Sequence, residues 1–121
     1  MSYFIDQPTE TMTGTQSIRF DFRNPGPVVI KLFSITIKID TATADPRTAY
    51  AEVGSDPFGA TKIIAMGTAS GYNDAVFRFS PPIIVGTNMS LAIHGFGDTG
   101  NKIGCQIESS DSFNYVGFNQ F

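Results

Sequence analysis

The chain has 121 residues, one cysteine and a net charge of −3. This length is typical of one domain, with enough residues for a hydrophobic core that needs no disulfide or metal. The Lys and Arg residues are scattered from Arg19 to Lys102, so the sequence has no basic cluster that would predict nucleic-acid binding. The longest apolar stretches, such as 27–30 and 81–85, are too short to cross a bilayer.

The low charge and the many phenylalanines suggest a surface that is partly covered. Charged residues make up 16% of the chain, against roughly 25% in ordinary globular domains. Aromatic residues make up 12%, and 11 of them are Phe. Contacts within an oligomer or a larger assembly would cover such a surface.

The first residues of the chain are expected to differ from the rest, in which hydrophobic and polar residues alternate from the first predicted strand onward. Residues 1–14 are expected to form an N-terminal arm in which Tyr3 and Phe4 can dock, and residues 15–121 a single domain. The first predicted strand, 16–22, places Ile18, Phe20 and Phe22 on one face, because successive side chains of a strand point to opposite faces.

The longest predicted strand covers residues 28–40. Its second half alternates, which predicts that Phe33, Ile35, Ile37 and Ile39 point inward. Leu32 and Phe33 are both large and apolar although they are adjacent, so we expect a β-bulge at this point.

The remaining sequence predicts further short strands separated by turn residues. We expect strands at 48–53, 61–66, 75–79, 83–85, 88–93, 102–108 and 113–116, with an exposed loop at 67–74. Phe77, Phe79 and Leu91 are expected to point inward, and Pro81 and Pro82 to interrupt the chain at a sheet edge or at a crossing between sheets.

These elements predict an all-β domain of about eight to ten short strands. Short connections favour antiparallel pairing. Prolines and long loops between the strands favour an antiparallel two-sheet β-sandwich of jelly-roll type over a closed barrel.

Part of this pattern resembles jelly-roll β-sandwich modules of the surface, adhesion and carbohydrate-binding type, which also decorate phage capsids and tails. The resemblance covers about residues 30–93. The segments that carry it are two stretches of alternating hydrophobic and polar residues, 33–39 and 89–93, and the short motifs Asp56-Pro-Phe-Gly59, Gly67-Thr68, Phe77-Arg-Phe79, Pro82-Ile-Ile84 and Gly86-Thr87. It implies a binding or assembly role for the fold.

We find no residue set that predicts catalysis. Cys105 lies in an alternating stretch and is expected to be a small buried residue. His94 is the only histidine, and it is expected on the surface or at a turn on the same face as Ser90 and Ala92. The chain is therefore expected not to be an enzyme.

The loops give no cofactor or metal motif. Residues 95–102 are rich in glycine, but Asn101 stands where a phosphate-binding loop needs Lys, so we expect a hairpin loop. Asp40, Asp45 and Asp98 fall in predicted loops, which leaves a structural Ca²⁺ as an alternative. We expect no cofactor.

Two segments are candidates for binding. Tyr72, Asn73 and Asp74 combine an aromatic ring, an amide and a carboxylate in one loop, as sugar-binding sites do. Phe118 and Phe121 are large aromatic residues in the C-terminal segment, where they close the sandwich or anchor a neighbouring subunit.

The leading hypothesis is a non-catalytic structural protein of a phage virion, such as a capsid decoration (cement) protein or a tail or fibre protein. It would be made in the host cytoplasm, because the N-terminal residues show no signal-peptide pattern. Its partners would be proteins, in a homo-oligomer for which fold analogy favours a trimer, with neither nucleic acid nor membrane as a partner. A carbohydrate-binding module is the alternative.

Overall fold

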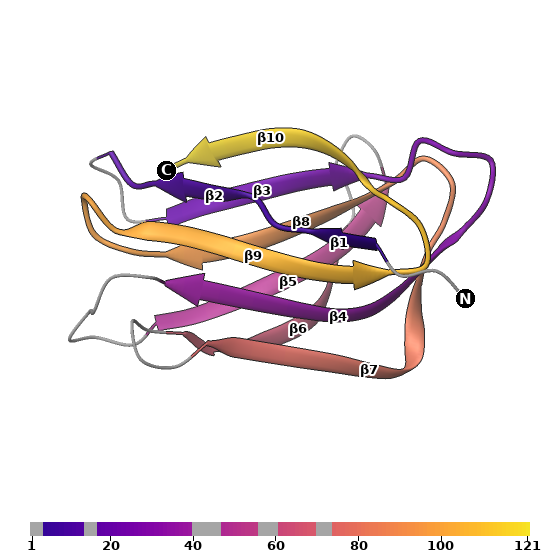
Figure 1. Cartoon of the computed structure of the whole chain (residues 1–121), viewed down its shortest axis with the longest axis horizontal. Coiled ribbons are helices and arrows are strands. Elements are labelled where there is room, and N and C mark those ends of the chain that lie inside the picture. Colours follow the sequence, from indigo (N-terminus) through magenta and orange to yellow (C-terminus); the bar gives the residue numbers. More distant parts are fainter. Residues whose placement is uncertain (1–3, 14–16, 40–46, 56–60, 70–73) are drawn as a thin grey trace.

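The structure is a computed structural model, and it describes residues 4–13, 17–39, 47–55, 61–69 and 74–121. These residues form strands joined by turns (Figure 1). The strands are β1 (Phe4–Asp6), β2 (Thr9–Thr11), β3 (Ser17–Arg23), β4 (Ile30–Ile39), β5 (Arg47–Ser55), β6 (Thr61–Ala69), β7 (Ala75–Val85), β8 (Met89–Phe96), β9 (Lys102–Ser109) and β10 (Asn114–Gln120). None of the described residues belongs to a helix that could cross a membrane.

The strands form two antiparallel sheets that pack face to face. One sheet has the order β1-β9-β4-β7, with β2 also paired to β9, and we call it the β9 sheet. The other has the order β10-β3-β8-β5-β6, and we call it the β8 sheet. The predicted all-β, antiparallel two-sheet sandwich is confirmed.

The order of the strands is that of a jelly roll. When β1 and β2 are counted as one interrupted strand, the β9 sheet and the β3-β8-β5-β6 part of the β8 sheet have four strands each. The chain passes repeatedly from one sheet to the other, as two Greek keys require. Strand β10 lies outside this pattern, because it is added to the free edge of β3.

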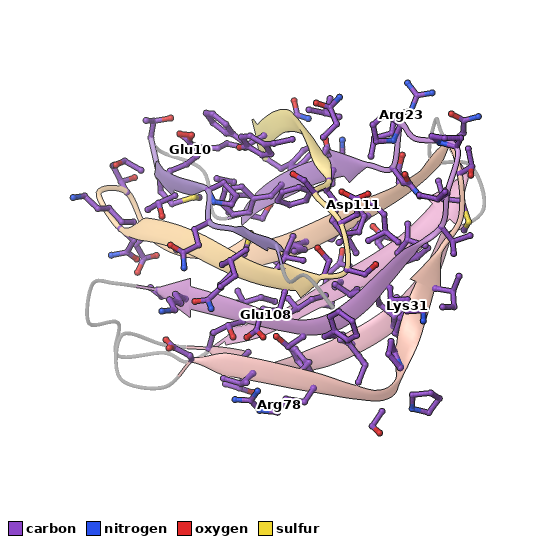
Figure 2. All side chains as sticks on the ribbon, turned by 45° about the vertical axis from the view of Figure 1, so that its right-hand side comes forward. Glu10, Arg23, Lys31, Arg78, Glu108 and Asp111 are labelled. Carbon is purple, nitrogen blue, oxygen red and sulfur yellow. The ribbon has the colours of Figure 1, made fainter. Side chains whose placement is uncertain are left out.

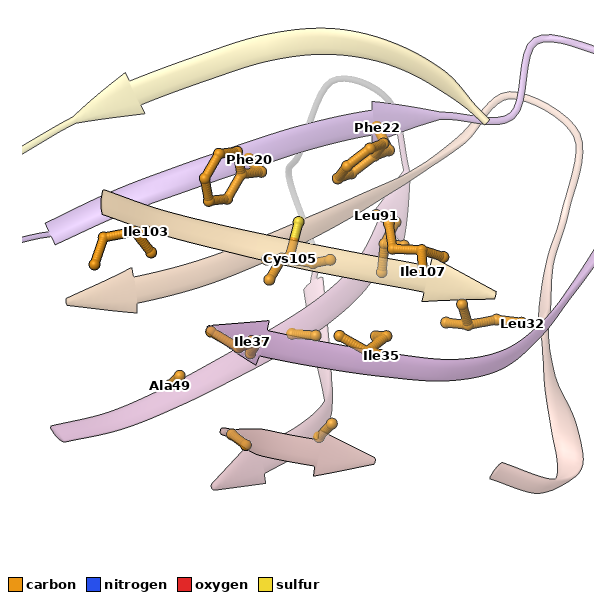
Figure 3. Close-up of a cluster of buried hydrophobic side chains, with 14 of the residues drawn as sticks. Phe20, Phe22, Leu32, Ile35, Ile37, Ala49, Leu91, Ile103, Cys105 and Ile107 are labelled. Atoms are coloured by element: carbon orange, nitrogen blue, oxygen red, sulfur yellow. The ribbon is translucent and has the colours of Figure 1, made fainter. Parts of the chain in front are cut away.

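The core lies between the sheets and contains the side chains that the alternation predicted. Figure 3 shows Phe20 and Phe22 of β3 facing Ile35 and Ile37 of β4 across the interior, and all four are almost completely buried. Leu91 of β8 is also fully buried. The sequence period of two therefore identified the inner face of the central strands.

The predicted bulge in β4 is confirmed. The pairing of β4 shifts between Leu32 and Ser34 on both of its neighbours, β7 and β9. Leu32 is fully buried, whereas Phe33, which we expected in the core, is half-buried. The extra residue of the bulge takes Phe33 out of the regular inward series that resumes at Ile35.

The prolines interrupt the pairing of a strand, as predicted, although they do not end the strand: the register of β7 with β4 passes from Arg78 opposite Ser34 to Ile83 opposite Leu32 and skips residues 79–82. Strand β7 continues through Pro81 and Pro82 to Val85. It is an edge strand, where one side of the backbone needs no N–H donors, and the predicted edge position is therefore correct. Phe77 and Phe79 are only partly buried, since an edge strand is covered less than a central one.

The predicted loop at 67–74 is shorter than expected, because β6 extends to Ala69. Residues 70–73 lie outside the described part of the chain.

The N-terminal segment is paired with the sheet. Strands β1 and β2 both pair with β9, and the Cys105 N–H donates to the Pro8 carbonyl at 3.2 Å. The close approach of β2 requires a glycine, since a Cβ at Gly104 would lie 2.9 Å from Thr9 Oγ1. The segment predicted as an arm is thus the outermost strand of the β9 sheet.

Two substitutions of the same kind test the assignment of inner and outer faces. Ile35→Ala should lower the free energy of unfolding by about 2–5 kcal/mol, because it leaves a cavity between the sheets. Ile84→Ala on β7, where the side chain is 51% exposed, should change it by less than about 0.5 kcal/mol. Urea unfolding measures both values, and equal losses would contradict the assigned faces.

Candidate functional site

Strand β10 presents an apolar, uncharged surface at the edge of the β8 sheet. Val116 is 63% exposed, Phe118 42% and Phe121 59%, and Tyr115 is also exposed. We call these four residues the β10 surface. The sequence Asn114–Gln120 contains no charged residue, and among the described residues no strand pairs with the outer edge of β10.

A bulge and an aromatic cluster set the position of β10. The pairing with β3 shifts between Tyr115 and Gly117, so that Val116 is the extra residue. Gly117 has a φ of +144°, a backbone conformation that favours glycine. On the inner side, the rings of Phe113 and Tyr115 pack on Phe22, with centroids 6.3 and 5.2 Å away. The start of β10 is therefore attached to the core.

Tyr115 stays uncharged at the edge of the sandwich. Burial, together with the nearby carboxylate of Glu10, raises the pKa of the Tyr115 hydroxyl to about 12. The phenol is protonated throughout the physiological range. The β10 surface therefore has no side chain that ionises near neutral pH.

The end of β10 is held by the side chain of Gln120. Its Oε1 accepts from the backbone N–H of Thr13 at 2.9 Å, and its Nε2 donates to the carbonyl of Thr11 at 2.9 Å. These bonds join the end of β10 in the β8 sheet to the last residue of β2, Thr11, and to Thr13 just after it. The exposed residues between Tyr115 and Gln120 are thus fixed at both ends.

Phe121 lies beside a polar group on the outer face of the β8 sheet. Its backbone N–H donates to the Ser17 carbonyl at 2.9 Å. The Arg19 guanidinium carbon is 5.5 Å from the centroid of the Phe121 ring, a cation–π distance. Arg19 Nε also donates to Asp21 Oδ1 at 2.7 Å, and Asn119 Nδ2 donates to the other carboxylate oxygen at 3.4 Å. Phe121 therefore has a defined position on the surface.

The other edges of the two sheets carry features that oppose pairing with another chain, such as prolines, charges or a short length. Strand β7 contains Pro81, Pro82 and Arg78, and β6 contains Lys62. Strands β1 and β2 have three residues each. Among the sheet edges that the described residues form, β10 differs from these because it is longer than β1 and β2, carries no charge and exposes aromatic residues.

His94 lies in the middle of the outer face of the β8 sheet, within a strand and not at a turn. Its face, shared with Ser90 and Ala92, is as predicted. The ring stacks on Tyr50 with centroids 4.1 Å apart, and Nε2 lies 2.5 Å from Glu52 Oε1. A carboxylate only accepts hydrogen bonds, so Nε2 carries the proton and donates it.

Burial lowers the pKa of His94 below its usual value, and the hydrogen bond to Glu52 only partly opposes this shift. The imidazole is therefore neutral near pH 7. Sequence reasoning missed Tyr50 and Glu52 as its partners, because both come from another strand.

The structure does not bring His94 and Cys105 together. Cys105 belongs to the β9 sheet, is 3% exposed and lies in the core, as predicted for a small buried residue (Figure 3). His94 faces outward from the other sheet. Within the described ranges no group of three or more His, Cys, Asp or Glu side chains could hold a metal ion.

The loop candidates are described only in part. The turn between β8 and β9 is not the hairpin that we expected, because β8 and β9 belong to different sheets and the chain crosses between them here. Within this turn the Asp98 N–H donates to Asn101 Oδ1 at 2.7 Å. Asp40 and Asp45, which we considered with Asp98 for Ca²⁺, lie outside the described residues.

Two sets of predicted binding residues also lie largely outside the described part of the chain. Tyr72 and Asn73 are outside it, and Asp74 is exposed. Tyr3 is outside it as well. Phe4 belongs to β1, but its side chain is not among those described.

Comparisons with protein-family models, with curated proteins and with solved structures found no match for this chain.

The burial of His94 predicts a pH dependence of stability. The unfolded chain takes up a proton as the pH falls through about 6.5, whereas the folded chain resists protonation until a lower pH. The stability that the neutral His94 imidazole contributes is therefore fully present above about pH 6.5 and is lost as the pH falls from there through the lower pKa of the folded chain. Between pH 7 and pH 5, His94→Gln should lose less unfolding free energy than the unmodified chain does.

Urea unfolding at both pH values measures this difference, and an NMR titration of the imidazole gives its pKa directly. An imidazole pKa above 6.5, or the same pH dependence in both proteins, would contradict the prediction.

Proposed function

We propose that the chain is a non-catalytic assembly protein that acts through protein–protein contacts made by the β10 surface. The observation that carries the proposal is an added edge strand without charge that exposes Val116 and Phe118. The jelly roll is complete without this strand. Its added feature is therefore the natural place for a contact.

The chemistry of β10 suits a protein partner. Pairing with another strand would satisfy the backbone groups along its outer edge, as in recognition by strand addition. Val116 and Phe118 would bury apolar area, and aromatic anchors supply much of the binding energy at interfaces. No charge on β10 would lose its hydration in the contact.

A second copy of the chain is the simplest partner, which makes a homo-oligomer the expected state, with a trimer favoured by fold analogy. At a finer level we propose a phage virion, in which the chain serves as a capsid decoration, tail or fibre protein. The support is the resemblance in residues 30–93 and the low-charge, Phe-rich composition. A jelly roll alone does not determine a role, and the carbohydrate-binding alternative at residues 72–74 stays a prediction.

Paired lysine substitutions test the β10 contact. The purified chain should self-associate in sedimentation velocity experiments over a range of concentrations. V116K together with F118K should weaken association at least about tenfold, because two desolvated charges would enter the contact. The matched control is V76K with I84K, which alters two exposed apolar residues on β7 and should leave association unchanged. A chain that stays monomeric at every concentration would refute self-assembly through β10.

The virion assignment has a separate test. An antibody against the chain should label purified particles of a virus that carries its gene, in immunogold electron microscopy. Particles that contain no labelled copies would refute this assignment, and the β10 contact would remain to be judged by sedimentation.

A further inference from the structure

A second candidate site lies on the outer face of the β9 sheet, whereas β10 belongs to the other sheet. It is a pocket of about 220 Å³ where β2, β9 and β4 lie side by side. Gly104 and Cys105 of β9 form part of it, and its other lining residues are Gln7, Thr9, Lys38, Lys102 and Gln106.

Strand register explains why a hollow forms here. Lys38 on β4 and Thr9 on β2 are the direct partners of Gly104, one on each side. Lys102 and Gln106 are two residues before and after it on the same face of β9. Gly104 has no side chain, so the Thr9 side chain can approach its backbone closely: a Cβ at Gly104 would lie 2.9 Å from Thr9 Oγ1. The absence of a side chain at this central position leaves the remaining space between its neighbours open.

The pocket is positively charged. Lys38 and Lys102 are diagonal neighbours on adjacent strands, and such residues are typically about 7–8 Å apart, within reach of long side chains. Both side chains are exposed and flexible enough to reach one anionic group between them. Within the described part of the chain neither lysine forms an ion pair, and no carboxylate lines the pocket.

The other lining groups suit hydroxyl groups. The amides of Gln7 and Gln106 donate and accept hydrogen bonds, as does the hydroxyl of Thr9. The volume is below the roughly 300–1,000 Å³ of pockets that enclose a drug-sized ligand. It fits one ring of a larger molecule. No large apolar side chain lines the pocket, which argues against an apolar ring.

We propose that this pocket binds one acidic sugar unit, with its carboxylate or sulfate between Lys38 and Lys102 and its hydroxyls on Gln7, Thr9 and Gln106. This inference does not depend on the proposed assembly role, because the site belongs to the other sheet. It also differs from the sugar site predicted at residues 72–74, which uses none of these residues.

An NMR titration tests the proposal with glucuronate as the probe and glucose as its neutral match. Glucuronate should shift the backbone amides of Gly104 and Gln106, with a dissociation constant of about 1 mM for a ligand of this size. Amides of the β8 sheet, such as those of Leu91 and Ile93, should not shift. Glucose should bind at least about tenfold more weakly, and raising the salt concentration should weaken glucuronate binding, because the contact is partly electrostatic.

Substitutions locate the site. K38Q with K102Q should weaken glucuronate binding at least about tenfold, which is the loss of one favourable charge contact. K31Q is the matched control, since Lys31 (labelled in Figure 2) is an exposed lysine near the start of the same strand, β4, whereas Lys38 lies near its end. Gln106→Ala should weaken the binding of glucuronate more than that of sulfate, which has no hydroxyl groups.

Four results would overturn the proposal. These are the absence of amide shifts at Gly104 and Gln106, equal binding of glucose, an equal effect of K31Q, or an unchanged glucuronate affinity in both K38Q/K102Q and Gln106→Ala. None of these variants alters β10. If the sugar-binding proposal fails, the sedimentation test of assembly is therefore unaffected.

Discussion

The packing of Phe22 in the interior is the contact on which most of this structure depends. Phe22 is fully buried on β3, within the cluster that joins both sheets. The rings of Phe113 and Tyr115 pack against it and so attach the last strand to the core. The same aromatic contact that closes the sandwich therefore also determines where β10, with its exposed Val116 and Phe118, meets the solvent.

The two proposed sites arise from departures from a regular sandwich. The β10 surface exists because one more strand is added beside β3 than the jelly roll contains. The pocket around Gly104 exists because a side chain is missing where β2 approaches β9. The sites lie on different sheets and differ in chemistry, since one is apolar and neutral and the other is polar and cationic. A protein held in an assembly through β10 could therefore keep the pocket open to a ligand.

Much of the core was predictable from the sequence, whereas the candidate sites were predictable only in part. The alternation at Phe20 and Phe22, and again at Ile35 and Ile37, records which residues face inward, because a strand places every second side chain on the same face. The aromatic residues near the C-terminus were recognisable as contact candidates. The hydrogen bond of His94 with Glu52 was not, since it joins residues 42 positions apart.

The sequence by itself determined the class of the fold, the inner faces of the central strands and the bulge at Phe33, because each of these depends on neighbouring residues. Only the tertiary structure decided that β7 passes through Pro81, and that β1 and β2 join β9. An edge strand tolerates what a central strand does not, and the position of a strand in a sheet depends on distant partners. The pocket around Gly104 likewise required the register of three strands.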